Sequence, residues 1–157
     1  THSTDNMTAL PDSTKINMAT STQNNGSGNN YVGYFFKEVP GFSAFGKAVG
    51  NGNNDGPFIY TGMRPNFFIA KNDNGEAWNM ADIYRLNAPY NPRGYFLHPN
   101  KTNTEATGLD YNKMDFVSNG VKFRNSHGQF NPSGVDFYYM AFGQSLVGSN
   151  NVPCTAR

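Results

Sequence analysis

The chain has one cysteine, Cys154, and no long run of apolar residues. A lone cysteine cannot form an intrachain disulfide, so no disulfide framework holds this fold, and the cysteine content indicates no compartment. No apolar stretch approaches the roughly 20 residues needed to span a bilayer, and the N-terminus lacks a basic segment followed by an apolar core. We therefore expect no membrane insertion.

Charge is also scarce. Asp, Glu, Lys and Arg make up 15% of the 157 residues, and the formal net charge is +1. The Lys and Arg residues are scattered without a run, which disfavours a nucleic-acid partner. His2, His98 and His127 are far apart, and none has a second His or Cys at metal-ligand spacing. We therefore expect no zinc site and no cofactor.

Motifs for catalysis are missing as well. No Ser lies in a nucleophile-elbow pattern, and no glycine-rich phosphate loop precedes a helix. Carboxylates are present, but nothing in the sequence pairs two of them across a cleft, as the hydrolysis of sugars requires. We predict that the chain is not an enzyme. One enzymatic hypothesis, a glycan-degrading activity, is kept beside this prediction. Asp82 and Asp110 are the first pair of carboxylates to test for it.

Turn residues and aromatic residues are abundant. The chain contains 23 Asn, 17 Gly and 9 Pro, which turns select because Gly and Asn accept positive φ and Pro fixes φ near a turn value. Its 13 Phe and 9 Tyr favour pleated, half-buried surfaces. Together these features predict an all-β fold, an antiparallel β-sandwich of the jelly-roll or lectin-like kind, as one domain over residues 31–157.

Short apolar runs separated by turn signals about every ten residues indicate where the strands lie. We expect strands at residues 31–37, 43–49, 57–62, 66–71, 77–81, 114–117, 121–124 and 135–143. The strongest hairpin signal, Asn-Gly, occurs in the turns at residues 51–56, 72–75 and 118–120. The connection over residues 83–111 is long and dense in Pro and aromatic residues, and such loops are often functional.

The strand signature near the C-terminus also occurs near the N-terminus. NGSG at residues 25–28 and YVGYFF at 31–36 correspond to NPSG at 131–134 and FYYMAF at 137–142, at a constant offset of 106 residues. Together with matching apolar alternation upstream of each copy, this predicts a β-hairpin at each end of the chain. Repetition at a long period indicates an array of similar units.

Residues 1–30 are therefore interpreted as a polar linker or an added N-terminal edge hairpin, the end of an upstream repeat in a longer polypeptide. The alternative is one complete sandwich with two pseudo-symmetric hairpins.

Aromatic and polar side chains in and before the 83–111 connection indicate a glycan-binding site. The C–H faces of sugars stack on aromatic rings, while hydroxyls take directional hydrogen bonds. The candidate ligand-binding residues are Trp78, Tyr84, Tyr90, Arg93, Tyr95 and His98. For Trp78 the default interpretation is core packing, with a surface sugar-stacking platform as the alternative; for the residues of the long loop the alternatives are loop packing or a subunit contact.

A weak candidate for a calcium site lies in the first Asn-rich turn. Asn51, Asn53 and Asp55 precede Gly56 with the spacing of the first half of a calcium loop. The bidentate acid expected later is replaced by Gly62, and only one of the three candidate ligands is charged. An Asn-rich turn without metal is the preferred interpretation.

Three runs together resemble a known type of domain. They are YVGYFFKEVPGFSAFG at residues 31–46, GNGNNDGPFIYTGMRP at 50–65 and SGVDFYYMAF at 133–142, with a chain end in Ala156-Arg157. This set resembles an uncharacterised domain at the C-termini of tail and fibre proteins of tailed bacteriophages. The resemblance implies location on a virion surface and implies no catalytic residue. Residues 143–145 depart from the family's pattern.

Two hypotheses follow from the resemblance. In the first, the domain ends a tail fibre or related appendage of a phage virion and contacts a glycan on the host surface. In the second, it is an architectural capsid or tail decoration subunit that binds other virion proteins. Sandwich edges must be covered in either case, so we expect a homo-oligomer, for which a trimer is one arrangement.

Overall fold

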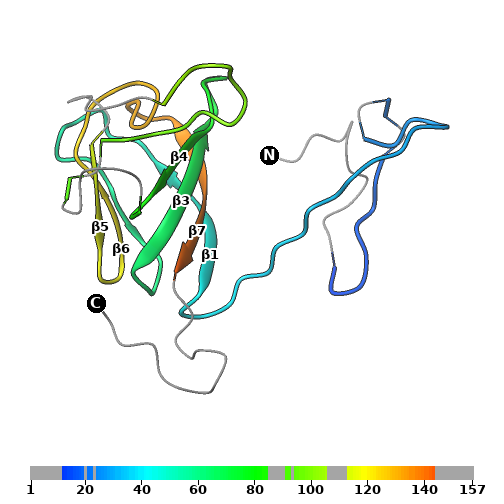
Figure 1. Ribbon diagram of the computed structural model, residues 1–157, viewed down its shortest axis with the longest axis horizontal. Helices are drawn as coiled ribbons and strands as arrows, with labels where there is room; N and C mark the ends of the chain where they lie inside the picture. Colours follow the sequence, from blue (N-terminus) through cyan, green and yellow to red (C-terminus); the bar gives the residue numbers. More distant parts are fainter. Residues whose placement is uncertain are drawn as a thin grey trace. The chain divides into compact units, whose positions relative to one another are not determined.

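The computed structural model describes residues 12–19, 21–22, 24–84, 91–92, 94–105 and 113–143. The chain divides into two compact units, Thr1–Phe36 and Lys37–Arg157. Among the described residues, every strand belongs to the second unit (Figure 1).

The second unit contains seven strands in two antiparallel sheets. They are β1 (Ser43–Val49), β2 (Phe58–Tyr60), β3 (Pro65–Asn72), β4 (Asn79–Asp82), β5 (Met114–Val117), β6 (Gly120–Phe123) and β7 (Asp136–Gly143). One sheet has the order β1-β7-β3-β4, and the other has the order β2-β6-β5. The described residues contain no helix. The predicted all-β sandwich is confirmed.

The Asn-Gly signal before β6 marks a tight hairpin. Val117 pairs with Gly120, so Ser118 and Asn119 form the two-residue connection between β5 and β6. Glycine is required at position 120 because a Cβ atom there would lie 2.1 Å from the carbonyl oxygen of Ile59 on the neighbouring strand β2. The same residue therefore ends the turn and lets β2 approach β6.

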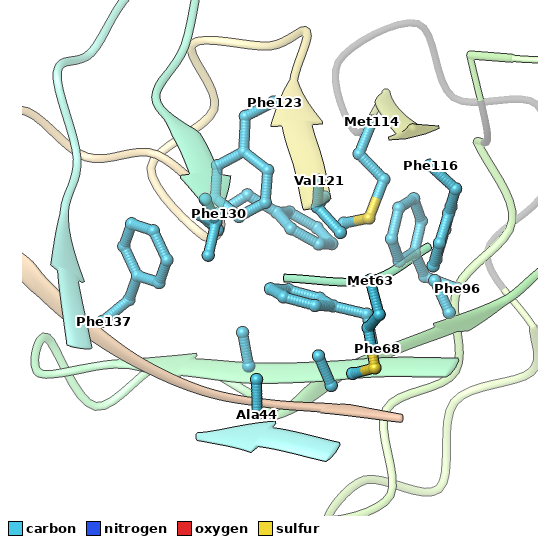
Figure 2. Packing of buried hydrophobic residues seen from close by; sticks show 14 residues of the cluster. Ala44, Met63, Phe68, Phe96, Met114, Phe116, Val121, Phe123, Phe130 and Phe137 are labelled. Atoms are coloured by element: carbon cyan, nitrogen blue, oxygen red, sulfur yellow. The ribbon is translucent and has the colours of Figure 1, made fainter. Parts of the chain in front are cut away.

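The core lies between the two sheets and is dominated by phenylalanine. Figure 2 shows Phe68 from β3 pointing toward Val121 and Met114 from the opposite sheet. The rings of Phe68 and Phe123 meet edge-to-face, with centroids 6.2 Å apart. Each fully buried Phe stabilises the fold by roughly 1.5–3 kcal/mol relative to an exposed one. The alternating pattern of the strands is what delivers these rings to a common interior.

A buried asparagine side chain connects two loops of this fold. Asn131 is fully buried, and its Oδ1 accepts a hydrogen bond from the backbone N–H of Asn51 at 2.7 Å. Its Nδ2 lies 2.8–2.9 Å from Asn51 Oδ1, Asn53 O and Asn125 O. One amide therefore joins the loop after β1 to the loop after β6. Buried polar groups need such partners, and here side-chain amides supply them.

Two strand predictions need correction. Residues 31–37 form no strand, because a strand requires a hydrogen-bonded neighbour and none adjoins them in the part of the chain described. The C-terminal hairpin is also wrong: β6 pairs with β2 and β5, whereas β7 pairs with β1 and β3 in the other sheet. Of the two segments that share the pattern, residues 137–142 lie in β7 and pair with β1 and β3, whereas residues 31–36 form no strand.

The described residues of the first unit are held by local turns. Asp12 Oδ1 accepts hydrogen bonds from the backbone N–H groups of Thr14 and Lys15, at 2.7 and 2.9 Å. The Tyr31 hydroxyl accepts a hydrogen bond from the N–H of Gly26 and donates one to the carbonyl of Thr22. Where described, residues 12–36 contain a single β-bridge residue, Met18, and no strand, so the interpretation of residues 1–30 as a linker or an edge hairpin stays a prediction.

Candidate ligand-binding site

The structure brings two of the predicted ligand-binding residues together. His98 Nδ1 lies 3.1 Å from the carbonyl oxygen of Trp78. Tyr84 follows β4 and is largely exposed, whereas Tyr95 is half-buried. Tyr90 and Arg93 lie outside the described residues. Trp78 and its surroundings are therefore the part of the predicted site that has a defined geometry.

Strand alternation turns Trp78 outward. Ala77 and Asn79 on either side of it are buried, and Ala70 of β3 pairs with Asn79. Continuing that register places Lys71 opposite Trp78 on the outer face of the four-stranded sheet. Trp78 is half-buried and is not part of the core, so its surface role is favoured over core packing.

Residues 97–100 hold Trp78 from the side. Leu97 and Met80 exchange backbone hydrogen bonds of 3.0 and 2.9 Å, which adds a short pairing to the edge of β4. The backbone N–H of Trp78 donates to Asn100 Oδ1 at 2.9 Å. The carbonyl oxygen of Trp78 can only accept a hydrogen bond, so His98 Nδ1 carries the proton and donates it. Both backbone polar groups of Trp78 are thus engaged by one neighbouring segment.

A second layer of amides orients this segment. Gln129 Nε2 donates to Asn79 Oδ1 at 2.8 Å and lies 3.3 Å from His98 Nδ1. Asn72 Nδ2 in turn lies 2.9 and 3.0 Å from the carbonyls of Gly128 and Gln129. The loop before Phe130 is therefore tied to the ends of β3 and β4, directly behind Trp78.

The outer surface beside Trp78 is hollowed. A depression of about 330 Å³, here called the Trp78 depression, is lined by Ile69, Trp78, Pro99, Asn100 and Met140. Ile69 and Met140 lie opposite each other on β3 and β7 and form an apolar surface next to the indole.

A second depression of about 610 Å³ adjoins the first. It is lined by Pro99, Asn100, Lys101, Thr102 and Asn103, and residues 100–103 are here called the polar rim. The two depressions share Pro99 and Asn100, so an apolar surface with an aromatic ring continues into amide, hydroxyl and ammonium groups. Such an arrangement can hold a ligand that has both an apolar face and many hydroxyl groups.

The oxygens of the weak calcium candidate are engaged within the protein. Asn51 Oδ1 accepts from the N–H of Asn53, and Asn53 Oδ1 accepts from the N–H of Asp55. The carboxylate of Asp55 lies 2.7 Å from Lys122 Nζ. The hydrogen bond and charge of Lys122 lower the pKa of Asp55, with a smaller contribution from Arg124. This loop is built as an Asn-rich turn closed by an ion pair.

No cluster of metal-binding size occurs in the described part of the chain. Its His, Cys, Asp and Glu residues form no group of three or more that could hold a metal ion. Asp82 Oδ1 accepts a hydrogen bond from the N–H of Tyr84, and Asp110, its proposed catalytic partner, lies outside the described residues. No helix suited to crossing a membrane occurs in that same part of the chain.

Comparison with protein families gives one match. Residues 1–145 match a family described as a domain of unknown function, DUF7483. The chain belongs to this family. No curated protein and no solved structure matches it. The family description names no activity, ligand or location, so the expected relation to bacteriophage tail proteins stays a prediction.

Sequence reasoning missed most of the lining of the two depressions. Ile69 and Met140 come from strands 71 residues apart in sequence, and only the insertion of β7 between β1 and β3 places them together. The polar rim carried a usable signal, since Asn, Lys and Thr alternate over residues 100–103 immediately after His98.

Proposed function

We propose that this chain is a non-catalytic binding module on the surface of a bacteriophage virion, at the end of a tail fibre or related appendage. Its Trp78 depression binds a sugar ring of a host surface glycan. The observation that carries the proposal is the joining of the Trp78 depression to the polar rim through Pro99 and Asn100. The location on a virion is supported by the resemblance of residues 31–65 and 133–142 to phage tail domains.

The chemistry of the site suits a sugar. The C–H face of a pyranose can stack on the indole of Trp78 and contact Ile69 and Met140, while hydroxyls at its edge reach the amides and hydroxyl of the rim. Because Asn100 and His98 already hold the Trp78 backbone, little conformational entropy is lost there on binding.

Glycan-array binding of wild-type protein and Trp78→Ala tests this function. We expect the variant to bind about tenfold more weakly, because it loses the stacking surface. Tyr60→Ala is the matched control: it removes another exposed aromatic ring, from β2 in the opposite sheet. If no glycan is bound in a Trp78-dependent way, the sugar-binding proposal fails.

A second candidate function is architectural, as a capsid or tail decoration subunit that binds virion proteins. It is favoured by a row of apolar residues across the outer face of the four-stranded sheet: Phe45, Met140, Ile69, Met80 and Leu97. The ring of Phe142 also contacts Phe42, Phe45 and Phe67 on that face. Such a surface suits a protein partner.

Position on the particle separates the two functions. Electron microscopy of virions labelled with an antibody to this domain should show label at the distal end of a tail or fibre if the domain contacts the host. Label over the capsid or along the tail shaft would support the architectural function instead.

A further inference from the structure

We infer that the sugar recognised at the Trp78 depression is anionic, a ring that carries a carboxylate such as a uronic acid. This inference rests on the proposed function and specifies its ligand. The starting observation is the charge of the lining. Among the eight residues that line the two depressions, Lys101 is the one ionisable residue, and none is acidic.

Lys101 is available to a ligand. Its backbone N–H donates to the carbonyl of His98 at 2.9 Å, which fixes the residue at the end of a tight turn. Its side chain is exposed and forms no ion pair with any residue in the described part of the chain.

Two other lysines of the described sandwich form ion pairs with acidic residues that line neither depression. Lys47 lies 2.7 Å from Asp136, and Lys122 lies 2.7 Å from Asp55. An ammonium group that lines a depression and has no counter-ion of its own is a favourable partner for a carboxylate.

A second lysine lies on the same outer face of the sheet. Lys71 lies opposite Trp78 in the β3–β4 register, and its Nζ donates to the carbonyl oxygen of Glu76 at 2.7 Å. Lys71 thus adds a cation to this face of the sheet but lines neither depression.

Two acids on this face have partners within the protein, and no acid of the described chain lines either depression. Asp136 pairs with Lys47, and Asp73 Oδ2 lies 3.5 Å from the Tyr138 hydroxyl. Glu76 lies in the exposed turn before Trp78 and does not line either depression. The electrostatics of the site favour an anionic ligand over a cationic one.

Geometry also defines where the charge of the ligand lies. Trp78, Ile69 and Met140 line only the first depression, whereas Lys101 lines only the second. A sugar ring stacked on Trp78 would place an equatorial carboxylate toward the polar rim, where Lys101 and the amides of Asn100 and Asn103 can receive it. A neutral sugar could still accept a hydrogen bond from Lys101, but only an acidic sugar would add an ion pair with it.

The test compares acidic polysaccharides with neutral forms of the same polymers. The array carries polygalacturonate beside its full methyl ester, and bacterial surface polysaccharides beside their carboxyl-reduced forms. We expect wild-type protein to bind the acidic member of a pair about fivefold more tightly, as one exposed ion pair allows. The preference should decrease at high salt, because salt screens exposed charges.

Substitutions of Lys101 test whether this residue causes the preference for acidic polysaccharides. Lys101→Met should abolish the difference between acidic and neutral forms, and Lys101→Arg should retain it. Lys37→Met, which removes an exposed cation that lines neither depression, should behave as wild type. Equal, Trp78-dependent binding of both forms would overturn the inference and leave the sugar-binding function intact. Absence of any Trp78-dependent binding would overturn both.

Discussion

The side chain of Asn100 accepts a hydrogen bond from the backbone N–H of Trp78 across 2.9 Å, although 22 residues separate them in sequence. Because of this bond, the segment that supplies the polar rim also fixes the aromatic residue of the site. This bond therefore joins the two parts of the proposed sugar site directly.

Asn100→Ala should weaken glycan binding about fivefold, because the loss of one side-chain-to-backbone hydrogen bond costs about 1 kcal/mol. Titration calorimetry with the best glycan from the array measures the effect. Asn54→Ala, in an exposed turn that lines neither depression, is the control and should bind as wild type. Unchanged affinity in Asn100→Ala would show that the bond does not position the ring.

The strands could be predicted from sequence because their signals are local. Alternation and Asn-Gly turns located β1 and β5 to the residue, as Ser43–Val49 and Met114–Val117. Partner choice could not be predicted, because pairing depends on segments distant in sequence. The place of β7 between β1 and β3 follows from such pairing, and so does the meeting of Ile69 and Met140 beside Trp78.

The burial of Asn131 is a second feature that could not be predicted from composition. Asn131 and Asn54 are the same residue type in similar Asn-rich loops, yet Asn131 is fully buried and Asn54 is exposed. The difference arises because the loops after β1 and β6 meet, which no local pattern reveals.

Asn131→Ala should destabilise the sandwich by about 3 kcal/mol, since it leaves the N–H of Asn51 and the carbonyls of Asn53 and Asn125 without this buried partner. The urea midpoint gives the measurement, with Asn54→Ala expected to stay near wild type. A midpoint equal to that of the control would mean that water replaces the amide at no cost.

Acid should remove the contribution of the Asp55–Lys122 ion pair. The folded-state pKa of Asp55 is held below its ordinary value of 3.8 by Lys122 and Arg124. A depressed carboxylate pKa adds stability that is present above the unfolded-state pKa and is lost as the pH falls through the folded-state pKa.

The urea midpoint of Asp55→Asn should therefore lie below that of wild type at pH 6, and the difference should disappear in acid, well below pH 3.8. High salt should reduce it at pH 6, because the carboxylate is exposed. A difference that is independent of pH would show that the charge of Asp55 does not cause the effect.

We expect this chain to self-associate, because it exposes apolar side chains and an unpaired strand edge. Val32, Tyr34 and Phe35 are 80, 80 and 75% exposed, and β1 is an edge strand with no further strand beside it in the described sheet. Exposed strand edges and apolar segments of this kind are normally covered by another chain.

We therefore expect a mass above 17.3 kDa by light scattering at micromolar concentration. Replacing Tyr34 and Phe35 with Ser should lower the mass toward that of one chain if this segment forms the contact. Tyr84→Ser, another highly exposed aromatic, is the control and should leave the mass unchanged. A wild-type chain that is monomeric under these conditions would contradict the expectation of a homo-oligomer. In that case a different protein becomes the candidate for covering the β1 edge.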